Sequence, residues 1–289
     1  MCIAAHCIVA ATAVAADDLP EADFGPAQVH LEIALATLGL QEAVDDGRLA
    51  VALVTLDGNE ATSLGMVNGD RMLYAASLPK IAILYGAAVA LDEGRITLTD
   101  SLEHDLVAMI RHSCNDCATR VLETVGRSWL LTLLQTDPYR FYDRKRGGGL
   151  WVGKDYARKG AFRRDPLKGL SHAATPWQVA RWYYLLINGE LASPEGTELM
   201  LECLSNPAIT HKFVKGLAEQ DTTALYRKSG TWRDYHADSI LVRAESVSYI
   251  LVALASDRQG GRWLEQLAIV LHERLVRANR PGGGASEPD

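Results

Sequence analysis

The sequence predicts an α/β (α+β) fold in which an antiparallel sheet, built from N-terminal and C-terminal strands, is flanked by helices. Strand-like segments occur near both ends of the chain, at residues 48–56, 61–67, 224–228, 236–243 and 246–255. Helical patterns fill the region between them. Of the 289 residues, 48% are hydrophobic and 22% are charged, which is typical of a globular protein with a sizeable core. The two ends should therefore meet in one sheet, with residues 98–206 forming a mainly helical lobe.

The N-terminal elements follow from hydrophobic spacing. Apolar residues recur at helical intervals over residues 26–46, which predicts an amphipathic helix. Residues 48–56 and 61–67 then form a hairpin around the turn Asp57-Gly58-Asn59. The next helix begins at Lys80, and because it is apolar nearly all round it should be central and buried.

The middle and C-terminal parts of the chain are mostly helical. Helices are predicted at residues 101–110, 118–125, 127–134, 175–187, 193–204 and 261–277. Residues 139–171 show no sustained periodicity and contain several glycines, so we expect a long surface loop there. One domain should span residues 26–277, followed by a Gly-rich, disordered tail at 281–289.

Charge and the first residues bear on partners and location. The formal net charge of -7 argues against general nucleic-acid binding, which needs a basic surface. Residues 1–16 are uncharged and end in Ala13-Val14-Ala15-Ala16, which resembles the cleavage site of a secretory signal peptide. The stretch is too short to span a membrane. We therefore expect a periplasmic or secreted protein, the alternative being a ragged, disordered N-terminus.

The cysteines do not form a dense disulfide framework. Cys114, Cys117 and Cys203 remain after the predicted signal segment, an odd number. The first two have the spacing of a redox or metal pair, but no second Cys/His pair at zinc spacing follows. Two ordinary helical thiols are therefore expected, with their pairing left open, and no metal site is predicted.

The stretch around Ser77 is the first candidate for chemistry. Ser77 lies where a strand-rich segment gives way to the Lys80 helix, so unpaired N–H groups and the helix dipole favour negative charge there. Pro79 fits the first helical turn. The spacing places Lys80 one turn along on the same face, and a hydroxyl, an amine and a positive helix end together describe an activated nucleophile. The alternative is an N-cap serine followed by a solvated lysine.

Two further motifs favour the nucleophile. Ser113-Cys114-Asn115 lies between two predicted helices, and Lys228-Ser229-Gly230-Thr231 lies at the end of a predicted strand. In this order, S-x-x-K, S-x-N and K-S-G resemble the signature of class A β-lactamases and penicillin-binding proteins. The resemblance covers residues 26–277 and implies a serine hydrolase of that fold.

The resemblance also implies catalytic roles. Ser77 would be the nucleophile that forms an acyl-enzyme, and Lys80 would help to remove its proton, which requires a pKa lowered by burial and nearby cations. Ser113 would pass a proton to the leaving nitrogen, with Lys228 steering it. Asn115 would orient Lys80 and the substrate's amide.

Substrate binding is implied in the same way. The backbone N–H groups of Ser77 and Thr231 would form the oxyanion hole, each donor contributing ~3 kcal/mol. Lys228, Ser229, Gly230 and Thr231 would hold a substrate that carries a carboxylate. The expected partner is thus a small molecule or peptide, the expected state is a monomer, and no cofactor is implied.

The release step departs from the family pattern. Class A enzymes use an omega-loop Glu to activate the deacylating water, yet no Glu occurs between Glu123 and Glu190. Asp155, Asp165 and His172 are the acid or imidazole candidates in the corresponding region. Of these, Asp155 and Asp165 are the candidate deacylating acids.

The same region is basic. Residues 140–168 contain ten Lys or Arg against three Asp, in a chain that is negative as a whole. This pattern indicates either a solvated loop or an electropositive rim that attracts an anionic substrate.

Three functions follow from these observations. The lead prediction is a hydrolase of the class A β-lactamase type that opens β-lactam rings and so confers antibiotic resistance. The second is a D-alanyl-D-alanine peptidase or amidase acting on wall peptides. The third is a penicillin-binding sensor that is acylated without turnover.

Overall fold

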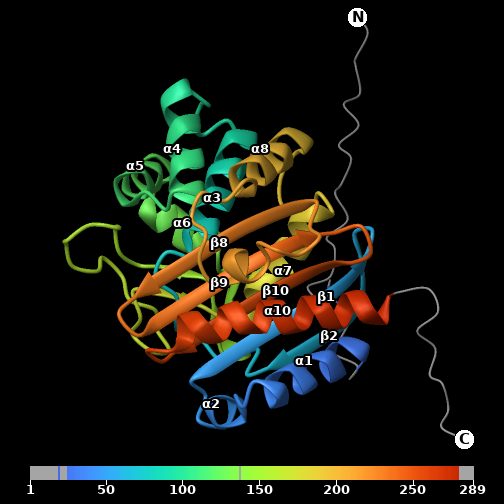
Figure 1. Ribbon diagram of the computed structural model, residues 1–289. Helices are drawn as coiled ribbons and strands as arrows, with labels where there is room; N and C mark the ends of the chain where they lie inside the picture. The colour runs from blue at the N-terminus through green and yellow to red at the C-terminus, as the bar shows by residue number, and fades with distance from the viewer. Residues whose placement is uncertain (1–18, 20–24, 137, 280–289) are drawn as a thin grey trace, which may run out of the picture.

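The computed structural model of the chain describes residue 19 and residues 25–136 and 138–279 (Figure 1). The predicted signal segment 1–16 and the predicted tail 281–289 lie outside the described residues. Within the described ranges, no helix is both long and apolar enough to cross a lipid bilayer.

A five-stranded antiparallel sheet forms the centre of the molecule, in the order β2-β1-β10-β9-β8. Its strands are β1 (Leu49–Asp57), β2 (Glu60–Val67), β8 (Ala224–Trp232), β9 (Tyr235–Arg243) and β10 (Ser248–Ser256). Leu53 in β1 pairs with Gly65 on one side and with Leu251 on the other. The prediction that N- and C-terminal strands meet in one sheet is therefore confirmed.

The two faces of the sheet belong to two hydrophobic cores. Along β1, Leu49, Val51 and Leu53 pack in the core that contains α1 (Pro26–Thr37) and α10 (Gly260–Ala278). The alternate residues Ala52 and Val54 pack in the other core. This alternation follows from the two-residue period of a strand, and it lets one sheet hold helices on both faces.

The second face carries the remaining long helices, which Figure 1 shows on the opposite side of the sheet from α1 and α10. They are α3 (Lys80–Asp92), α4 (Asp100–Arg111), α5 (Asn115–Val125), α6 (Arg127–Leu133), α7 (Pro176–Ile187) and α8 (Pro194–Leu204). As predicted, α3 is buried along nearly its whole length. Thr99 caps α4 and Thr175 caps α7 through side-chain oxygens that accept N–H bonds.

Two expectations about the elements are wrong, and one element was not predicted. The predicted helix 26–46 is two helices, α1 and α2 (Gln41–Asp45), because the chain turns at Gly39 with φ of 64°. The K-S-G motif lies inside β8 rather than at its end. The short helix α9 (Phe213–Gly216) was not predicted.

The predicted surface loop at 139–171 is partly core. It contains β4 (Tyr142–Asp143), a 3₁₀ turn at Arg144–Arg146, β5 (Gly148–Gly149) and β6 (Trp151–Val152). Strand β7 (His172–Ala174) follows it and pairs with β6 on one side and with β3 (Leu73–Tyr74) on the other. Phe141, Tyr142 and Trp151 are buried, so the aromatic residues among the basic ones anchor the segment. This placement brings the segment against the residues that precede Ser77.

Candidate active site

Ser77 lies in a turn between β3 and α3 and lines a cavity of about 980 Å³. The turn is closed by bonds from the Leu78 N–H to the Ala75 carbonyl and from the Lys80 N–H to the Ser77 carbonyl. Ala76 has a positive φ of 49°, which is unfavourable for a residue with a side chain. Such strain concentrates at functional sites, where the surrounding structure enforces it.

Lys80 is the first residue of α3 and is fully buried. Its Nζ donates to the Ser113 carbonyl at 2.7 Å, to Asn115 Oδ1 at 2.8 Å and to the Cys114 carbonyl at 3.3 Å. Burial lowers the pKa of Lys80 to about 7. The amine is thus held by neutral oxygens and shifted toward its neutral form, as a general base requires.

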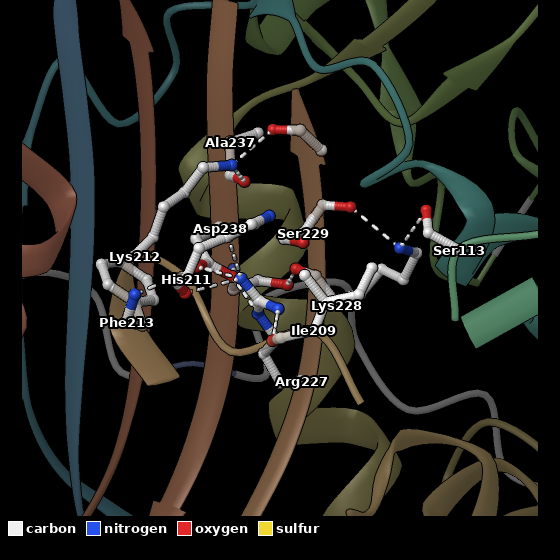
Figure 2. A network of polar contacts seen from close by, with 12 residues as sticks. Ser113, Ile209, His211, Lys212, Phe213, Arg227, Lys228, Ser229, Ala237 and Asp238 are labelled. Carbon is white, nitrogen blue, oxygen red and sulfur yellow. Dashed lines mark hydrogen bonds and ion pairs between the residues drawn. The ribbon is translucent and has the colours of Figure 1, made fainter. Parts of the chain in front are cut away.

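The Ser113 hydroxyl lies between two lysine amines. Lys228 Nζ donates to Ser113 Oγ at 3.0 Å, and Lys80 Nζ lies 3.4 Å from the same oxygen. Figure 2 shows Lys228 reaching from β8 toward Ser113. Burial, followed by the charge of Lys80, lowers the pKa of Lys228. Ser113 itself has a positive φ of 55°. A hydroxyl placed between two buried amines is suited to carry a proton between them.

The edge of the sheet lies directly beside Ser77. A Cβ on Gly230 would meet the Ala75 carbonyl oxygen at 2.2 Å and the Ser77 nitrogen at 2.7 Å, so only glycine fits there. Thr231, the next residue of β8, lines the same cavity as Ser77. The structure thus brings the two predicted oxyanion-hole residues to one wall. Ser229 is buried next to them in the same strand.

The two predicted deacylating carboxylates are engaged elsewhere. Asp155 borders the cavity, but Arg127 binds both of its oxygens, at 2.6 and 2.9 Å. Asp165 is buried in the loop, where Tyr142 Oη and the N–H groups of Leu167, Lys168 and Leu170 bond to it. Neither bonds to Lys80, and among the described residues no carboxylate forms an ion pair with that amine. In the structure both aspartates are therefore held by groups other than Lys80.

An aromatic side chain faces Lys80 instead. Lys80 Nζ lies 4.4 Å from the centre of the Tyr156 ring, and Tyr156 Oη donates to the Ala76 carbonyl at 3.3 Å. The Tyr156 ring packs on His172 with 4.3 Å between centroids. Burial lowers the pKa of His172 to about 4 and raises that of Tyr156, so both stay neutral near pH 7. Tyr156 lies in the predicted loop 139–171, and nothing in the sequence spacing linked it to Lys80.

Cys114 and Cys117 form a disulfide, which corrects the expectation of two thiols. Cys114 caps α5, and the first helical turn brings the two Cα atoms to 5.4 Å, within disulfide range. The bridge joins Cys114 of the S-x-N motif to Cys117 beyond it, and the Cys114 carbonyl and the Asn115 side chain hold Lys80. Cys203 is a buried free thiol. Within the described ranges, no cluster of three or more His, Cys, Asp or Glu is placed to hold a metal ion.

Comparison with known proteins places this geometry in context. Residues 139–274 match the β-lactamase enzyme family. No curated protein matches the sequence. The crystal structure of a β-lactamase from Sphaerobacter thermophilus matches with a TM-score of 0.65 and 18% identity, covering 87% of this chain and 97% of that one.

Two other solved structures agree with it. A variant of the last common ancestor of the class A β-lactamases of Gram-negative bacteria matches with a TM-score of 0.67 and 17% identity, covering 85% of this chain and 99% of that one. A mutant of PBP-A, solved as an acyl-enzyme complex with penicillin G, matches with a TM-score of 0.61 and 19% identity over 82% of this chain and 96% of its own. The chain therefore has the fold of the β-lactamase and penicillin-binding serine hydrolases.

Proposed function

We propose that this protein is a serine hydrolase that is acylated at Ser77 by β-lactams and opens their amide bond. The observation that carries the proposal is the position of the Ser113 hydroxyl between the amines of Lys80 and Lys228. Asn115, which binds Lys80, lines the same cavity as Ser77. This arrangement supports the proposal because acylation needs a base for the serine proton and a donor for the departing nitrogen.

Acylation follows from these contacts. Lys80, with its pKa near 7, accepts the Ser77 proton as Oγ attacks the lactam carbonyl. The N–H groups of Ser77 and Thr231 stabilise the negative oxygen of the tetrahedral intermediate. Ser113 then donates a proton to the lactam nitrogen as the C–N bond breaks, and Lys228 replaces the proton on Ser113. The cation of Lys228 also favours a substrate that carries a carboxylate.

Release of the acyl group is the weak step. In class A enzymes a carboxylate activates the deacylating water, whereas here Lys80 faces the neutral ring of Tyr156. Hydrolysis of the ester should therefore be slow, because no described carboxylate bonds to Lys80 and a misplaced base loses orders of magnitude in rate. This observation favours the two alternatives, a wall-peptide peptidase and a penicillin-binding sensor, on which the penicillin adduct would persist.

The N-terminal residues and the basic loop support a location and a substrate class. We propose that the protein acts in the periplasm or outside the cell, because residues 1–16 resemble a secretory signal. The ten basic residues of 140–168 support an anionic substrate.

A chromogenic cephalosporin and a D-alanyl-D-alanine peptide distinguish the candidates. Hydrolysis of the cephalosporin supports a β-lactamase, release of D-alanine supports a peptidase, and a stable adduct with neither activity supports a sensor. Ser77→Ala should abolish all three responses. Retention of activity in Ser77→Ala would refute the proposed nucleophile.

A further inference from the structure

Lys212 is a buried cation beneath the strand that carries the K-S-G motif. It precedes α9 and has a positive φ of 53°, a backbone conformation that favours glycine. Its Nζ donates to the Gly230 carbonyl at 2.7 Å and to the Ala237 carbonyl at 3.0 Å. Figure 2 shows its side chain extending along β9 to Ala237, on the far side of Asp238 from Lys228. The lysine thus contacts both strands at one register position, since Gly230 pairs with Ala237.

The Gly230 carbonyl belongs to the same peptide unit as the Thr231 N–H. In a planar trans peptide these groups point in opposite directions, so a donor on the carbonyl polarises the N–H on the other side. Hydrogen bonds in series strengthen one another by roughly 10–30% per bond. The proposed mechanism places the Thr231 N–H in the oxyanion hole. That N–H therefore belongs to an amide whose Gly230 carbonyl accepts a hydrogen bond from the Lys212 ammonium.

The charge of Lys212 is not cancelled by its neighbours. Asp238 is the acid of this network, but Arg227 binds both of its oxygens at 2.7 Å. Asp238 also accepts the Phe213 N–H at 3.2 Å. Lys212 interacts electrostatically with five titratable or charged groups, which are Arg227, Asp238, His211, Lys228 and His236. Burial lowers the pKa of His211 to about 4 and also lowers that of His236, so both are neutral at pH 7.

We propose that Lys212 is a positioning residue that polarises the Gly230–Thr231 amide and so strengthens the oxyanion hole. This role rests on the proposed acyl transfer at Ser77. It assigns a function to a buried lysine that the three sequence motifs do not include. The lysine touches no reacting atom and acts through one peptide unit.

The sequence offers an internal control for a direct test. Gly-Thr pairs occur only at Gly230–Thr231 and at Gly196–Thr197, which lies in α8. Labelling the full chain with [1-¹³C]glycine and [¹⁵N]threonine therefore yields two cross-peaks in a carbonyl–amide correlation spectrum. Burial lowers the pKa of Lys212 to about 8, so its proton is lost within an accessible pH range.

Between pH 6.5 and 9.5 the Gly230–Thr231 cross-peak should move with a midpoint near 8, while the Gly196–Thr197 cross-peak stays in place. The part of this cross-peak shift that follows the titration of Lys212 should vanish in Lys212→Met. A part caused by the titration of Lys228 should remain in that variant. Lys212→Arg serves the same comparison if the methionine variant does not fold, because a guanidinium does not titrate in this range. An unchanged titration in either folded variant, or no movement in the native protein, overturns the proposal.

Acylation kinetics supply the functional readout. Removing an oxyanion donor costs about 10²–10³ in rate, so weakening one should slow acylation by a fluorescent penicillin about tenfold. Lys215→Met is the matched control, because Lys215 lies on α9 and pairs with Glu265 at the surface. Equal rates in Lys212→Met and Lys215→Met overturn the role in catalysis. If the native protein forms no acyl-enzyme, the proposed function fails, while the spectra still decide whether Lys212 polarises the amide.

Discussion

The Lys80 amine is contacted by different kinds of groups from its two sides. On the side of α5 and β8, its amine is bonded to the Ser113 carbonyl and Asn115, and Lys228 completes the contact to the Ser113 hydroxyl. On the side of the 139–171 segment, it meets the Tyr156 ring, which packs on His172. We call the first side, with Ser113, Asn115 and Lys228, the acylation side, because its groups move protons in the proposed reaction. We call the second side, with Tyr156 and His172, the release side, and it presents a neutral aromatic surface. Under the proposed function, this difference means that the groups for acyl-enzyme formation gather around Lys80, whereas among the described residues no carboxylate pairs with it to support release.

The largest expected effect concerns the acylation side. Lys80→Met removes the proposed base and its bonds to the Ser113 carbonyl and Asn115. General-base catalysis contributes 10²–10⁴-fold, so acylation by a fluorescent penicillin should slow by about 10³-fold. Stopped-flow measurement of adduct formation checks this. A variant that is acylated at the native rate would show that another group removes the Ser77 proton.

The next prediction concerns a carboxylate introduced on the release side, in place of the Tyr156 ring. Tyr156→Glu places a carboxylate where the ring now faces Lys80, so the acyl-enzyme should hydrolyse faster, by about 10²-fold. The same change should raise the pKa of Lys80, because an opposite charge favours the ammonium. The lifetime of the adduct, followed by intact-mass spectrometry, measures the effect.

A matched variant separates charge from packing at this position. Tyr156→Phe keeps a neutral ring and loses only the bond to the Ala76 carbonyl. Its adduct should remain long-lived. If the glutamate and phenylalanine variants release the acyl group equally fast, the missing carboxylate does not limit release.

The pH dependence of acylation follows from Lys80. Its lowered pKa of about 7 means that the neutral amine, the form that accepts a proton, is lost as the pH falls below that value. The acylation rate should therefore drop about tenfold per pH unit below 7 and level off above it. His172, with its pKa near 4, should leave this profile unaffected above pH 5. A flat profile between pH 5 and 7 would contradict the assignment of the base.

The smallest effect concerns the disulfide beside the S-x-N motif. Replacing both cysteines, as Cys114→Ser with Cys117→Ser, removes a bridge across four residues. The chain-entropy model gives a loss of about 2 kcal/mol in the free energy of unfolding for so short a loop. Denaturant unfolding measures it, with Cys203→Ser as the control that leaves the bridge intact. An unchanged unfolding free energy would mean that the first turn of α5 holds itself without the bridge.

Local patterns predicted the acylation side because its residues lie in short motifs. Ser77 and Lys80 are three residues apart at a helix start. Ser113 and Asn115 are two residues apart, and Lys228 begins the consecutive K-S-G motif. The alternating strands and the apolar helix from Lys80 likewise predicted the sheet and the buried centre of the molecule, because burial imposes those periods.

Contacts between residues far apart in the sequence could not be predicted from such local patterns. Tyr156 reaches Lys80 because β7 pairs with β3 on one side and with β6 on the other, which holds the 139–171 segment against the cavity. Nothing in the sequence indicated that Arg127 would bind Asp155 or that the loop N–H groups would bind Asp165. Lys212 lies in a stretch without periodicity, and its bond to the Gly230 carbonyl depends on the tertiary fold.

The most direct test of the central claim is a rapid-quench experiment with intact-mass detection after mixing the protein with penicillin G. We expect rapid addition of one antibiotic mass, located on Ser77 by peptide mapping and absent in Ser77→Ala, followed by slow loss of that mass. A protein that hydrolyses the antibiotic quickly without accumulating the adduct would contradict the claim that release is the weak step. A protein that reacts at a residue other than Ser77 would contradict the account of the site itself.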